Sequence, residues 1–404
     1  MSIHPQHAPD GWNICNIGQL GQLVGGATPS TAADGYFGGD IVWLAPSDLT
    51  PLSDAEIYIS NSATKLSAAG FKSCSTKLLP EGAICMSSRA TLGECAIAAV
   101  PLCTNQGFIS IVCNPEIDNR FLLYWIKQNA SYISRFSAGT TFLEIPRRTF
   151  GSLRVCLPTS KQEQARIADL INAVDRTIAA TQASIDAAQK LKRGLIQNLL
   201  TGKLKPDGTW RRDDEFDIDL KIGRVPKTWS IGKFKDFFVL QRGADLTDAE
   251  HKHGSVPVVK SNGIDGHHDV ALVKAPGVTT GRSGTIGQVF YIEEDFWPHN
   301  TALYVKDFKG NYPRFCYYLI SLMQFDKFAA GTGVPTLNRR DIHVQRICIP
   351  DESEQKEICK ILDNCDAEIE SRKKKLALLQ RVKKSLMQNL LTGKVRIPPG
   401  LKIE

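Results

Sequence analysis

The sequence predicts a mixed α/β (α+β) fold in which two domains are separated by an antiparallel coiled coil of two long helices. The first observation is an internal repeat: residues 164–203 align without a gap with residues 355–394, and the copies end in LIQNLLTGK and LMQNLLTGK. The second is a heptad pattern of apolar residues in both copies. The third is that the segments between the copies share an order of predicted elements but differ in sequence and length. A duplicated frame with unlike inserts indicates an internal pseudo-two-fold repeat.

The repeat sets the boundaries that we expect along the chain. In order, these are a first domain at 1–158, a first repeat helix at 159–203, a linker at 204–225, a second domain at 226–350, and a second repeat helix with a tail at 351–404. Pro9 and Trp12 recur as Pro226 and Trp229, so the frame extends to the start of each domain. The linker is inferred from its polar composition of mixed charge.

Each domain is expected to combine a hairpin, a further strand and a helix. In the first, GAICMSSRATLGECAIAAV reads as two strands around a glycine turn, followed by the strand GFISIVC and a helix at 119–136. In the second, the same order ends in a helix at 313–329. The apolar spacing in these two helices indicates that they face the domain cores.

Both repeats carry the seam of a coiled coil. Apolar residues step by alternating fours and threes for more than four heptads. Each helix would extend about 55–60 Å at 1.5 Å per residue. The predicted core residues are Ile167, Ile171, Val174, Ile178, Ile185, Leu195 and Leu199 in the first helix, and Ile358, Leu362, Ile369, Leu376, Leu379, Leu386 and Leu390 in the second.

The charge pattern predicts how the helices pair. Both helices are acidic early and basic late, so a parallel pair would bring like charges together along much of its length. An antiparallel pair places Asp175 near Arg381 or Lys383, Asp186 near Arg372, and Lys190 near Glu368. Each exposed ion pair contributes only about 0.2–1 kcal/mol, but the same charges attract in the antiparallel orientation of the helices and repel in the parallel one. The alternative is that each helix packs separately on its own domain as a charged surface helix.

Composition limits the class of protein. The net charge of +7 permits an anionic partner without requiring one. The eleven cysteines include no C-x-x-C pair, which favours free thiols in a reducing cytoplasm. No apolar run reaches the length of a membrane span, and the start of the chain does not resemble a signal peptide. We therefore expect a cytoplasmic protein with no membrane partner.

A search for catalytic and metal-binding motifs predicts a chain without chemistry of its own. Asn114-Pro115 is followed by Glu116, so the [DN]-P-P-[YFW] loop of a methyltransferase is absent. No G-x-x-x-x-G-K-[ST] phosphate loop occurs. Four histidines, at 251, 253, 267 and 268, lie in a Gly/Asp-rich stretch without cysteines or carboxylates at ligand spacing. We interpret that stretch as a solvated loop, and we expect no catalytic and no metal-binding residues.

The repeated segments resemble a known family. LIQNLLTGKL and LMQNLLTGKVRI end long helices, and each helix is preceded by a Pro, Gln and Ile segment, LPTSKQEQARIADLI and IPDESEQKEICKILD. These features resemble the specificity subunit of type I restriction–modification systems. The resemblance covers the whole chain, although the inserts match the family's target-recognition domains only in outline.

The resemblance implies a function and a set of partners. Each target-recognition domain would read one half of a split, asymmetric site in double-stranded DNA, and the helical pair would set the spacer and dock the modification subunits. Those subunits carry N6-adenine methyltransferase chemistry, and ATP-driven restriction subunits complete the complex. No cofactor would bind this chain, whereas the complex would use S-adenosylmethionine, and ATP with Mg²⁺ for restriction. The alternative is a stand-alone DNA-binding regulator or a coiled-coil scaffold.

Candidate DNA contacts are polar side chains near glycine turns. Arg89 in SSRATLGE and Arg282 in GRSGTIGQ are placed at the same turn, where they could hold a phosphate or a guanine edge. The Arg-Arg pairs that follow the two Gly-Thr segments offer further positive charge. The alternatives are surface arginines of a tight hairpin, or arginines that cap the junction between domain and helix. The full set of candidates is Arg89, Thr91, Asn105, Gln106, Arg147, Arg148, Lys260, Asn262, Arg282, Ser283, Thr285, Arg339 and Arg340.

Overall fold

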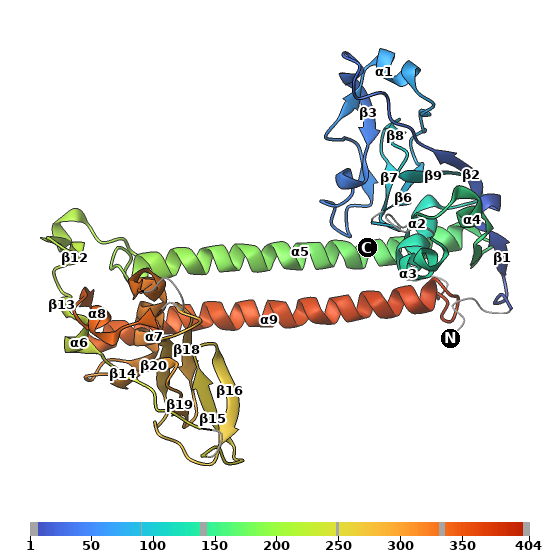
Figure 1. Cartoon of the computed structure of the whole chain (residues 1–404). Helices are drawn as coiled ribbons and strands as arrows, with labels where there is room; N and C mark the ends of the chain where they lie inside the picture. Colours follow the sequence, from blue (N-terminus) through green and yellow to red (C-terminus); the bar gives the residue numbers. More distant parts are fainter. Residues whose placement is uncertain (1–6, 90, 138–143, 248–249, 331–335, 399–404) are drawn as a thin grey trace. The chain divides into compact units, whose positions relative to one another are not determined.

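The chain folds as two compact units that share the two long helices. The computed structural model describes residues 7–89, 91–137, 144–247, 250–330 and 336–398. Unit 1 is residues 1–184 with 372–404, and unit 2 is residues 185–371. Helix α5 (Lys161–Leu199) begins in unit 1 and ends in unit 2, whereas α9 (Glu352–Leu390) begins in unit 2 and ends in unit 1 (Figure 1).

The described residues of unit 1 form three sheets. A five-stranded sheet has the order β2-β9-β6-β7-β4, with strands Gly21–Gly25, Phe108–Cys113, Ile84–Ser87, Cys95–Ala98 and Tyr58–Ile59. A three-stranded sheet has the order β5-β3-β8, with strands Lys65–Leu66, Phe37–Leu44 and Cys103–Thr104. Strand β1 (Trp12–Asn16) pairs with β10 (Arg154–Pro158), directly before α5.

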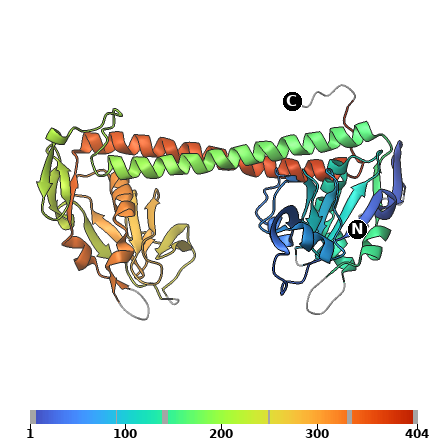
Figure 2. The same cartoon turned by 90° about the horizontal axis from the view of Figure 1, so that it is seen from above.

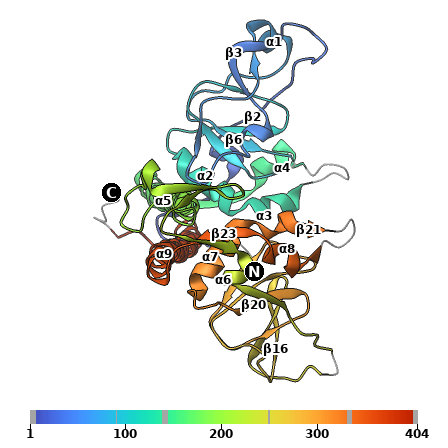
Figure 3. The same cartoon turned by 90° about the vertical axis from the view of Figure 1, so that its left-hand side faces the viewer.

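Short helices connect these sheets to the long helices. They are α1 (Ala68–Ser73), α2 (Asn119–Gln128), α3 (Ala130–Ile133) and α4 (Arg147–Ser152), with 3₁₀ turns at Ile17–Gln19, Pro46–Asp48 and Ser134–Phe136. Figure 3 shows β2 and β6 between α5 and the more distant pair β3 and α1. The main core of the unit joins Phe121 and Trp125 of α2 to Ile84 of the sheet, Ile171 of α5 and Leu390 of α9. Both long helices therefore belong to the core of this unit.

Unit 2 repeats this topology. A four-stranded sheet has the order β14-β20-β17-β18 (Val239–Arg242, Ala302–Asp307, Gly277–Gly281, Val289–Ile292), and a three-stranded sheet has the order β16-β15-β19 (Gly263–His268, Val256–Lys260, Trp297–Pro298). The pair β13 (Ser230–Lys233) and β23 (Arg346–Ile349) precedes α9, as β1 and β10 precede α5. Unit 2 also contains α6 (Phe234–Phe237), α7 (Pro313–Met323), α8 (Arg339–His343), β21 (Ala329–Ala330), β22 (Thr336–Leu337) and 3₁₀ turns at Asp213–Glu215 and Phe325–Phe328, besides a hairpin described below.

The long helices run antiparallel in both units, which confirms the prediction from charge. In unit 1 the ammonium of Lys383 lies 2.6 Å from a carboxylate oxygen of Asp175, and in unit 2 Lys192 pairs with Asp366. All fourteen predicted core residues are buried or half-buried. Each helix has 39 residues, or about 58 Å at 1.5 Å per residue. Figures 1 and 2 show the two helices side by side within each unit.

Three local expectations differ from the structure. Residues 204–225, predicted as a linker, contain a hairpin of β11 (Phe216–Asp219) and β12 (Gly223–Pro226). The helix expected at 119–136 is interrupted at Asn129, whose side-chain amide donates to the Trp125 carbonyl at 2.8 Å and competes with the helix. The helix expected at 313–329 ends at Met323, because Gln324 takes a left-handed conformation at φ +51°.

Candidate nucleic-acid interface

A buried glutamine at the start of each repeat helix fixes the helix to its domain. The side-chain oxygen of Gln164 accepts from the Asp118 N–H at 2.8 Å, and its amide donates to the Pro158 carbonyl at 2.9 Å. Gln355 makes the same two bonds, to Tyr312 and Pro350, at 2.8 and 2.9 Å. Each glutamine thus joins its long helix to the last strand of the domain and to the start of the core-facing helix, α2 or α7. Because both ends of the buried side-chain amide are hydrogen-bonded, the domain is held in one orientation on the long helix.

A charged cluster connects each domain to both long helices. In unit 1 the Lys383 ammonium pairs with Asp175 at 2.6 Å and with Asp54, from the domain, at 2.7 Å. In unit 2 the Tyr318 hydroxyl donates to Asp366 at 2.9 Å, and Asp366 also pairs with Lys192. Asp175 and Asp366 occupy equivalent positions of the repeat, as do Lys192 and Lys383. The two units therefore use the same helix positions to hold the antiparallel pair in register.

Burial and charge act in opposite directions on this cluster. Burial raises the pKa of Asp175, although its bond to Lys383 lowers it in part. Burial alone would lower the pKa of Lys383, but the hydrogen bonds to Asp175 and Asp54 raise it above its usual value. The lysine therefore stays charged and compensates a carboxylate whose side chain is fully buried.

The Gly-Lys motif that ends each repeat packs on the recurring Pro and Trp. Gly202 and Gly393 have φ of +68° and +70°, a conformation that favours glycine. A Cβ at Gly202 would lie 2.3 Å from Cγ of Pro226, and a Cβ at Gly393 would lie 2.8 Å from Cγ of Pro9. The recurrence of these residues in the sequence therefore reflects one packing contact made once in each unit.

Four chain segments meet at one edge of unit 2, which we call the strand-end site of unit 2. Backbone hydrogen bonds join Ala244 to Pro298 (2.9 Å), Arg282 to Thr301 (2.8 Å) and Leu337 to Arg282 (2.8 Å). These segments line an open cavity of about 680 Å³. Its polar lining residues are Gln241, Arg242, Asp245, Arg282, Thr336, Asn338, Arg339 and Arg340. The structure thus brings Arg282 and the Arg-Arg pair of the second domain together.

This site is strongly positive. Arg242 lies 3.6 Å from Asp245, which also accepts a hydrogen bond from the side-chain amide of Asn300. Arg282 makes a long contact of 3.4 Å with the Asn300 carbonyl, and Arg339 and Arg340 are exposed. One carboxylate thus faces four guanidinium groups in the cavity lining, an arrangement suited to phosphates and to base edges.

A histidine lies next to Asn300, beside the unit 2 site. His299 Nδ1 lies 3.0 Å from the Thr301 hydroxyl, which also accepts from the Ser261 N–H at 3.3 Å. Burial, followed by the positive charge of Lys260, lowers the pKa of His299 below its usual value. At neutral pH this imidazole is therefore uncharged.

Unit 1 forms its strand-end site from the same backbone with other side chains. The bonds Ala27 to Thr104 (3.0 Å), Ser88 to Gly107 (2.8 Å) and Ile145 to Ser88 (3.2 Å) correspond to those of unit 2. Gln106 is exposed and its side-chain oxygen accepts a hydrogen bond from the Thr28 hydroxyl, whereas the Asn105 side chain caps the local turn by accepting from the Gly107 N–H at 2.8 Å.

The arginines of the unit 1 site differ in their surroundings. Arg89 pairs with Glu144 at 2.8 Å, with both side chains 39% exposed, so its charge is already compensated. Arg147 and Arg148 are exposed at the start of α4, as Arg339 and Arg340 are at the start of α8. A guanidinium nitrogen of Arg147 would lie 3.7 Å from a Cβ at Gly25, which places it beside the end of β2.

The prediction that Arg89 and Arg282 occupy the same place is wrong by one residue. Ser87 pairs with Phe108 in the ladder of unit 1, and Gly281 pairs with Ala302 at the equivalent rung of unit 2. Arg282 therefore corresponds to Ser88, and Arg89 corresponds to Ser283. The backbone ladder sets the register, and side chains one residue apart on an extended strand point to opposite faces. The two turns have equal lengths, so Thr91 and Thr285 are equivalent.

Several residues of the strand-end sites were missed by sequence reasoning. These are Thr28, Arg242, Asp245, His299 and Asn300. A signal was present, because Gly26-Ala27 and Gly243-Ala244 follow equivalent strands. A Cβ at Gly26 would lie 2.1 Å from the Asn105 carbonyl oxygen, and one at Gly243 would lie 2.2 Å from the His299 carbonyl oxygen. Recurring glycines mark these close backbone crossings.

The other candidates lie beside the unit 2 site or are partly engaged. Lys260 pairs with Asp265 at 3.0 Å, and Asn262 is exposed at the turn between β15 and β16. Thr91 donates to the Ser87 hydroxyl at 3.3 Å. Ser283 forms a backbone bridge with Thr336, and Thr285 is exposed. The charge of Lys260 is therefore compensated by Asp265, as that of Arg89 is by Glu144.

Several cysteine and histidine side chains lie in the cores of the two units. Within the described parts of the chain, no cluster of three or more His, Cys, Asp or Glu side chains could bind a metal ion. His268 is buried against Trp297 with ring centroids 5.1 Å apart, so it is a core residue rather than a solvated one. All eleven cysteines are free. Among the described residues, no helix combines the length and the apolar character needed to cross a bilayer.

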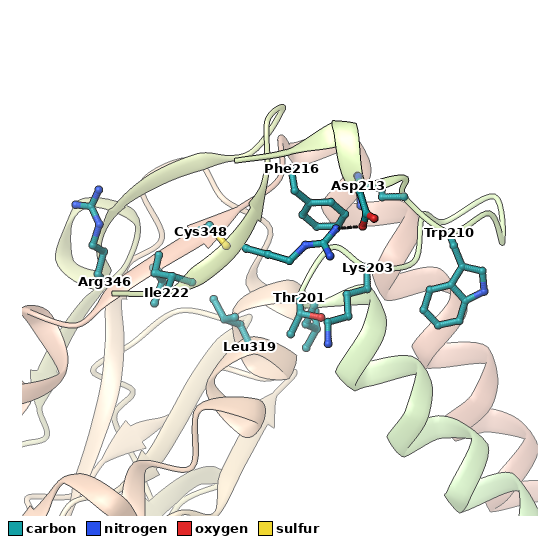
Figure 4. A pocket seen from close by; sticks show the side chains of 13 residues that line it. Thr201, Lys203, Trp210, Asp213, Phe216, Ile222, Leu319, Arg346 and Cys348 are labelled. Carbon is teal, nitrogen blue, oxygen red and sulfur yellow. Dashed lines mark hydrogen bonds and ion pairs between the residues drawn. The ribbon is translucent and has the colours of Figure 1, made fainter. Parts of the chain in front are cut away.

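A second cavity, of about 650 Å³, lies beside the end of α5 in unit 2 (Figure 4). The hairpin β11–β12 forms one wall, where Arg224 stacks on Phe216 at 4.4 Å and pairs with Asp213 at 2.5 Å. Trp210, which is 62% exposed, and Lys203 of the repeated Gly-Lys motif line the other side. The segment predicted as a linker thus builds a cavity on the last turn of the first repeat helix.

The repeated frame carries one polar site in each unit, and both sites present side chains of the types that contact DNA. The family described as the type I restriction modification DNA specificity domain matches residues 9–190 and 226–381. The chain belongs to this family, and it functions as the specificity subunit of a type I restriction–modification system.

Individual relatives agree over the whole length. The chain is 25% identical to the type I restriction enzyme MjaIX specificity subunit of Methanocaldococcus jannaschii, over 96% of this chain and 94% of that one. It is 24% identical to the EcoprrI specificity subunit of Escherichia coli, over 92% and 91% of the two chains. The crystal structure of the S subunit of a type I system from M. genitalium shares the fold, with a TM-score of 0.60 at 16% identity over 96% of this chain and 97% of that one. None of these comparisons supports the alternative of a stand-alone regulator or scaffold.

Proposed function

We propose that unit 1 and unit 2 each read one half of a split, asymmetric site in double-stranded DNA. The observation that carries this proposal is the pair of strand-end sites, which share their backbone hydrogen bonds but present unlike side chains. The shared backbone would present each reader to DNA in the same way, whereas the positions at which the side chains differ would give the two half-sites different base sequences. The two 39-residue helices set the spacer between the half-sites.

A domain exchange tests the two-reader proposal. Residues 47–141 are replaced by the corresponding insert of another family member, and genomic methylation is mapped in cells that also express the modification subunit. We expect one half of the methylated site to change while the other half and the spacer stay the same. A change in both halves would reject independent readers.

We further propose that two copies of the modification subunit dock on the ends of the repeat helices. Gln197 and Lys203 in unit 2 are identical to Gln388 and Lys394 in unit 1, and all four are exposed. Core packing explains identity at buried positions, but identity at exposed positions is explained by a partner that binds twice. Restriction subunits would complete the complex.

A charge reversal tests this docking. Lys203→Glu and Lys394→Glu should each remove one copy of the modification subunit in native mass spectrometry of the purified complex, and the double variant should remove both. Lys384→Glu, at an exposed position of α9 outside the motif, serves as the matched control. Retention of both copies by the double variant would place the docking surface elsewhere.

The proposed division of labour leaves this chain without catalysis. The modification subunits would bind S-adenosylmethionine and methylate adenine at N6, and the restriction subunits would use ATP with Mg²⁺ to cleave, all in the cytoplasm. The support is the lack of methyltransferase and nucleotide-binding motifs in the sequence. Purified chain with S-adenosylmethionine should leave a DNA substrate unmodified, and addition of the modification subunit should yield N6-methyladenine. Methyl transfer by the chain alone would refute this division.

A further inference from the structure

The two strand-end sites can be compared residue by residue, because their backbone hydrogen bonds fix the equivalence. Ala27 and Ala244 occupy one position, Gly107 and Thr301 another. Counting from these, Thr28 corresponds to Asp245, and Gln106 corresponds to Asn300. The Arg147-Arg148 pair corresponds to Arg339-Arg340, since each pair opens the short helix after the equivalent bonded residues Ile145 and Leu337. The comparison therefore separates positions that are shared from positions that differ.

The shared positions are the two Arg-Arg pairs. All four arginines are exposed, and none has an acidic partner within the described residues. A DNA backbone presents the same phosphates whatever its sequence, so contacts to it can use the same side chains in both units. Identical, exposed and uncompensated guanidinium groups fit this role.

At the positions that differ, each unit holds a carboxamide in the same place. In unit 2, Asp245 accepts a hydrogen bond from the Asn300 amide. In unit 1, Thr28 donates a hydrogen bond to the Gln106 amide oxygen. Each holding residue follows the close backbone crossing at Gly243 or Gly26, and both carboxamides remain accessible. Both units thus have a carboxamide at this position and a hydrogen-bonding partner at the same place. The side chain is Gln in unit 1 and Asn in unit 2, and the partner is Thr28 or Asp245.

A carboxamide oriented in this way matches one base edge. Asn and Gln side chains can accept from N6 and donate to N7 of adenine in the major groove at the same time. Each retains donor and acceptor capacity beyond the single bond to its holding residue, because an amide has two N–H groups and two oxygen lone pairs. The difference of one methylene changes how far this group extends from the backbone, so the two units would contact their adenine at different depths in the groove.

We infer that Gln106 and Asn300 are base-reading residues of the two half-sites, positioned by Thr28 and Asp245, and that the two Arg-Arg pairs hold phosphates. This inference rests on the proposed function of two independent readers. It assigns an adenine contact to each carboxamide, and it makes Thr28 and Asp245 positioning residues rather than contacts.

The test compares variants of the full-length chain in selections from randomised duplex DNA and in binding titrations at several salt concentrations. Asn300→Ala should remove the base preference at one position of the second half-site and lower affinity for the preferred site by about 5–150-fold, with the first half-site unchanged. Gln106→Ala should do the reverse. Asp245→Ala should weaken the same preference as Asn300→Ala, and Asp245→Asn, which can still accept from the amide, should restore it in part.

The arginines that hold phosphates have a different signature. Arg339→Ala and Arg340→Ala should reduce affinity for all sequences alike and flatten the dependence of log K on log salt by about 1 for each phosphate that is no longer neutralised. They should leave every base preference intact. Arg147→Ala and Arg148→Ala provide the matched pair in unit 1.

The outcomes separate this inference from the proposal on which it depends. If wild-type chain selects no bipartite site, the two-reader function fails. If wild-type chain selects such a site but Asn300→Ala and Gln106→Ala keep every base preference, the assignment of the carboxamides is overturned while the two-reader function stands. A loss of base preference in Arg339→Ala would overturn the assignment of that residue to phosphate. Unchanged melting temperatures of these surface variants exclude a folding defect as the cause.

Discussion

Replacement of Lys383 by methionine should destabilise unit 1 through the carboxylate that it leaves behind. The Asp175 side chain is fully buried, and the Lys383 ammonium at 2.6 Å is its ionic partner in the structure. Removal of one partner of a buried ion pair costs about 3–5 kcal/mol, because the remaining charge is uncompensated. In a unit of this size, each kcal/mol lost from the free energy of unfolding lowers Tm by about 2–4 °C, so Tm should fall by about 6–20 °C at pH 7.

The loss should depend on pH in a defined direction. Burial raises the pKa of Asp175, and removal of Lys383 also removes the bond that lowers it, so in the variant this pKa rises further. A carboxyl with a raised folded-state pKa stabilises the fold below its unfolded pKa of about 3.9, and that contribution is lost as the pH rises through the folded pKa. Lys383 also lowers the pKa of Asp54, which stabilises the fold above the unfolded pKa of that carboxyl. The variant loses this stabilisation at neutral pH. Both effects make the difference between variant and wild type smaller on acidification.

The assay is thermal unfolding followed by circular dichroism from pH 4.5 to 8, with two controls. Lys384→Met changes the neighbouring exposed lysine and should stay within about 0.5 kcal/mol of wild type. The double variant Asp175→Leu/Lys383→Met removes both charges and should recover wild-type stability or exceed it by about 1–4 kcal/mol. Equal Tm values for Lys383→Met and Lys384→Met at pH 7, or a deficit that does not shrink at low pH, would refute the assignment of a compensating buried pair.

Further predictions follow from single positions of the frame. Gly194→Ala, at an open helical position of α5, should raise the free energy of unfolding by about 0.5–1 kcal/mol. Gly202→Ala, at φ +68° and against Pro226, should lower it by about 1–3 kcal/mol. Thermal unfolding of the two variants measures both changes. Gln355→Leu should leave the Tyr312 N–H and the Pro350 carbonyl without a hydrogen-bond partner, which lowers the free energy of unfolding by about 1–3 kcal/mol for each group. Hydrogen exchange in the first turn of α7 should become faster, and Gln388→Leu, at an exposed position, is the control. Insertion of seven residues after Ser184 and of seven after Ser371 should lengthen each helix by about 10 Å. The spacer between the half-sites should then grow by about three base pairs, while both half-sites keep their sequences. Sequencing of the methylated sites measures the spacer and the half-sites.

The helical frame was predictable because its signal is periodic and repeated. The heptad seam identifies the buried face without any knowledge of the domains, and the charge asymmetry fixes the orientation, since reversal would place like charges together. The sequence placed Asp175 near Arg381 or Lys383, and the structure shows the pair with Lys383. Pro9, Trp12 and their copies marked a packing contact, although the sequence did not show that their partners are Gly393 and Gly202.

The register of the strand-end sites was not predictable from residue types. Alignment of the conspicuous arginines placed Arg89 opposite Arg282, whereas the ladders show a difference of one residue. A strand has a period of two, so an error of one residue moves a side chain to the other face. The hairpin at Phe216–Pro226 was missed for a related reason: Ile218 and Leu220 are 83% and 102% exposed, so the segment lacks the apolar inward face by which strands are recognised.

The same duplication explains both the stability and the division of roles in this chain. Where the two halves must meet the same surroundings, as at Gln164 and Gln355 or at Lys192 and Lys383, residue type and partners are kept. At the strand-end sites, the backbone hydrogen bonds are kept while side chains such as Thr28 and Asp245 differ. A frame whose buried contacts are made within each unit does not depend on those side chains, since substitutions at exposed sites away from such contacts typically change stability by less than about 0.5 kcal/mol. Side chains can therefore change at one strand-end site without loss of the fold or of the other site.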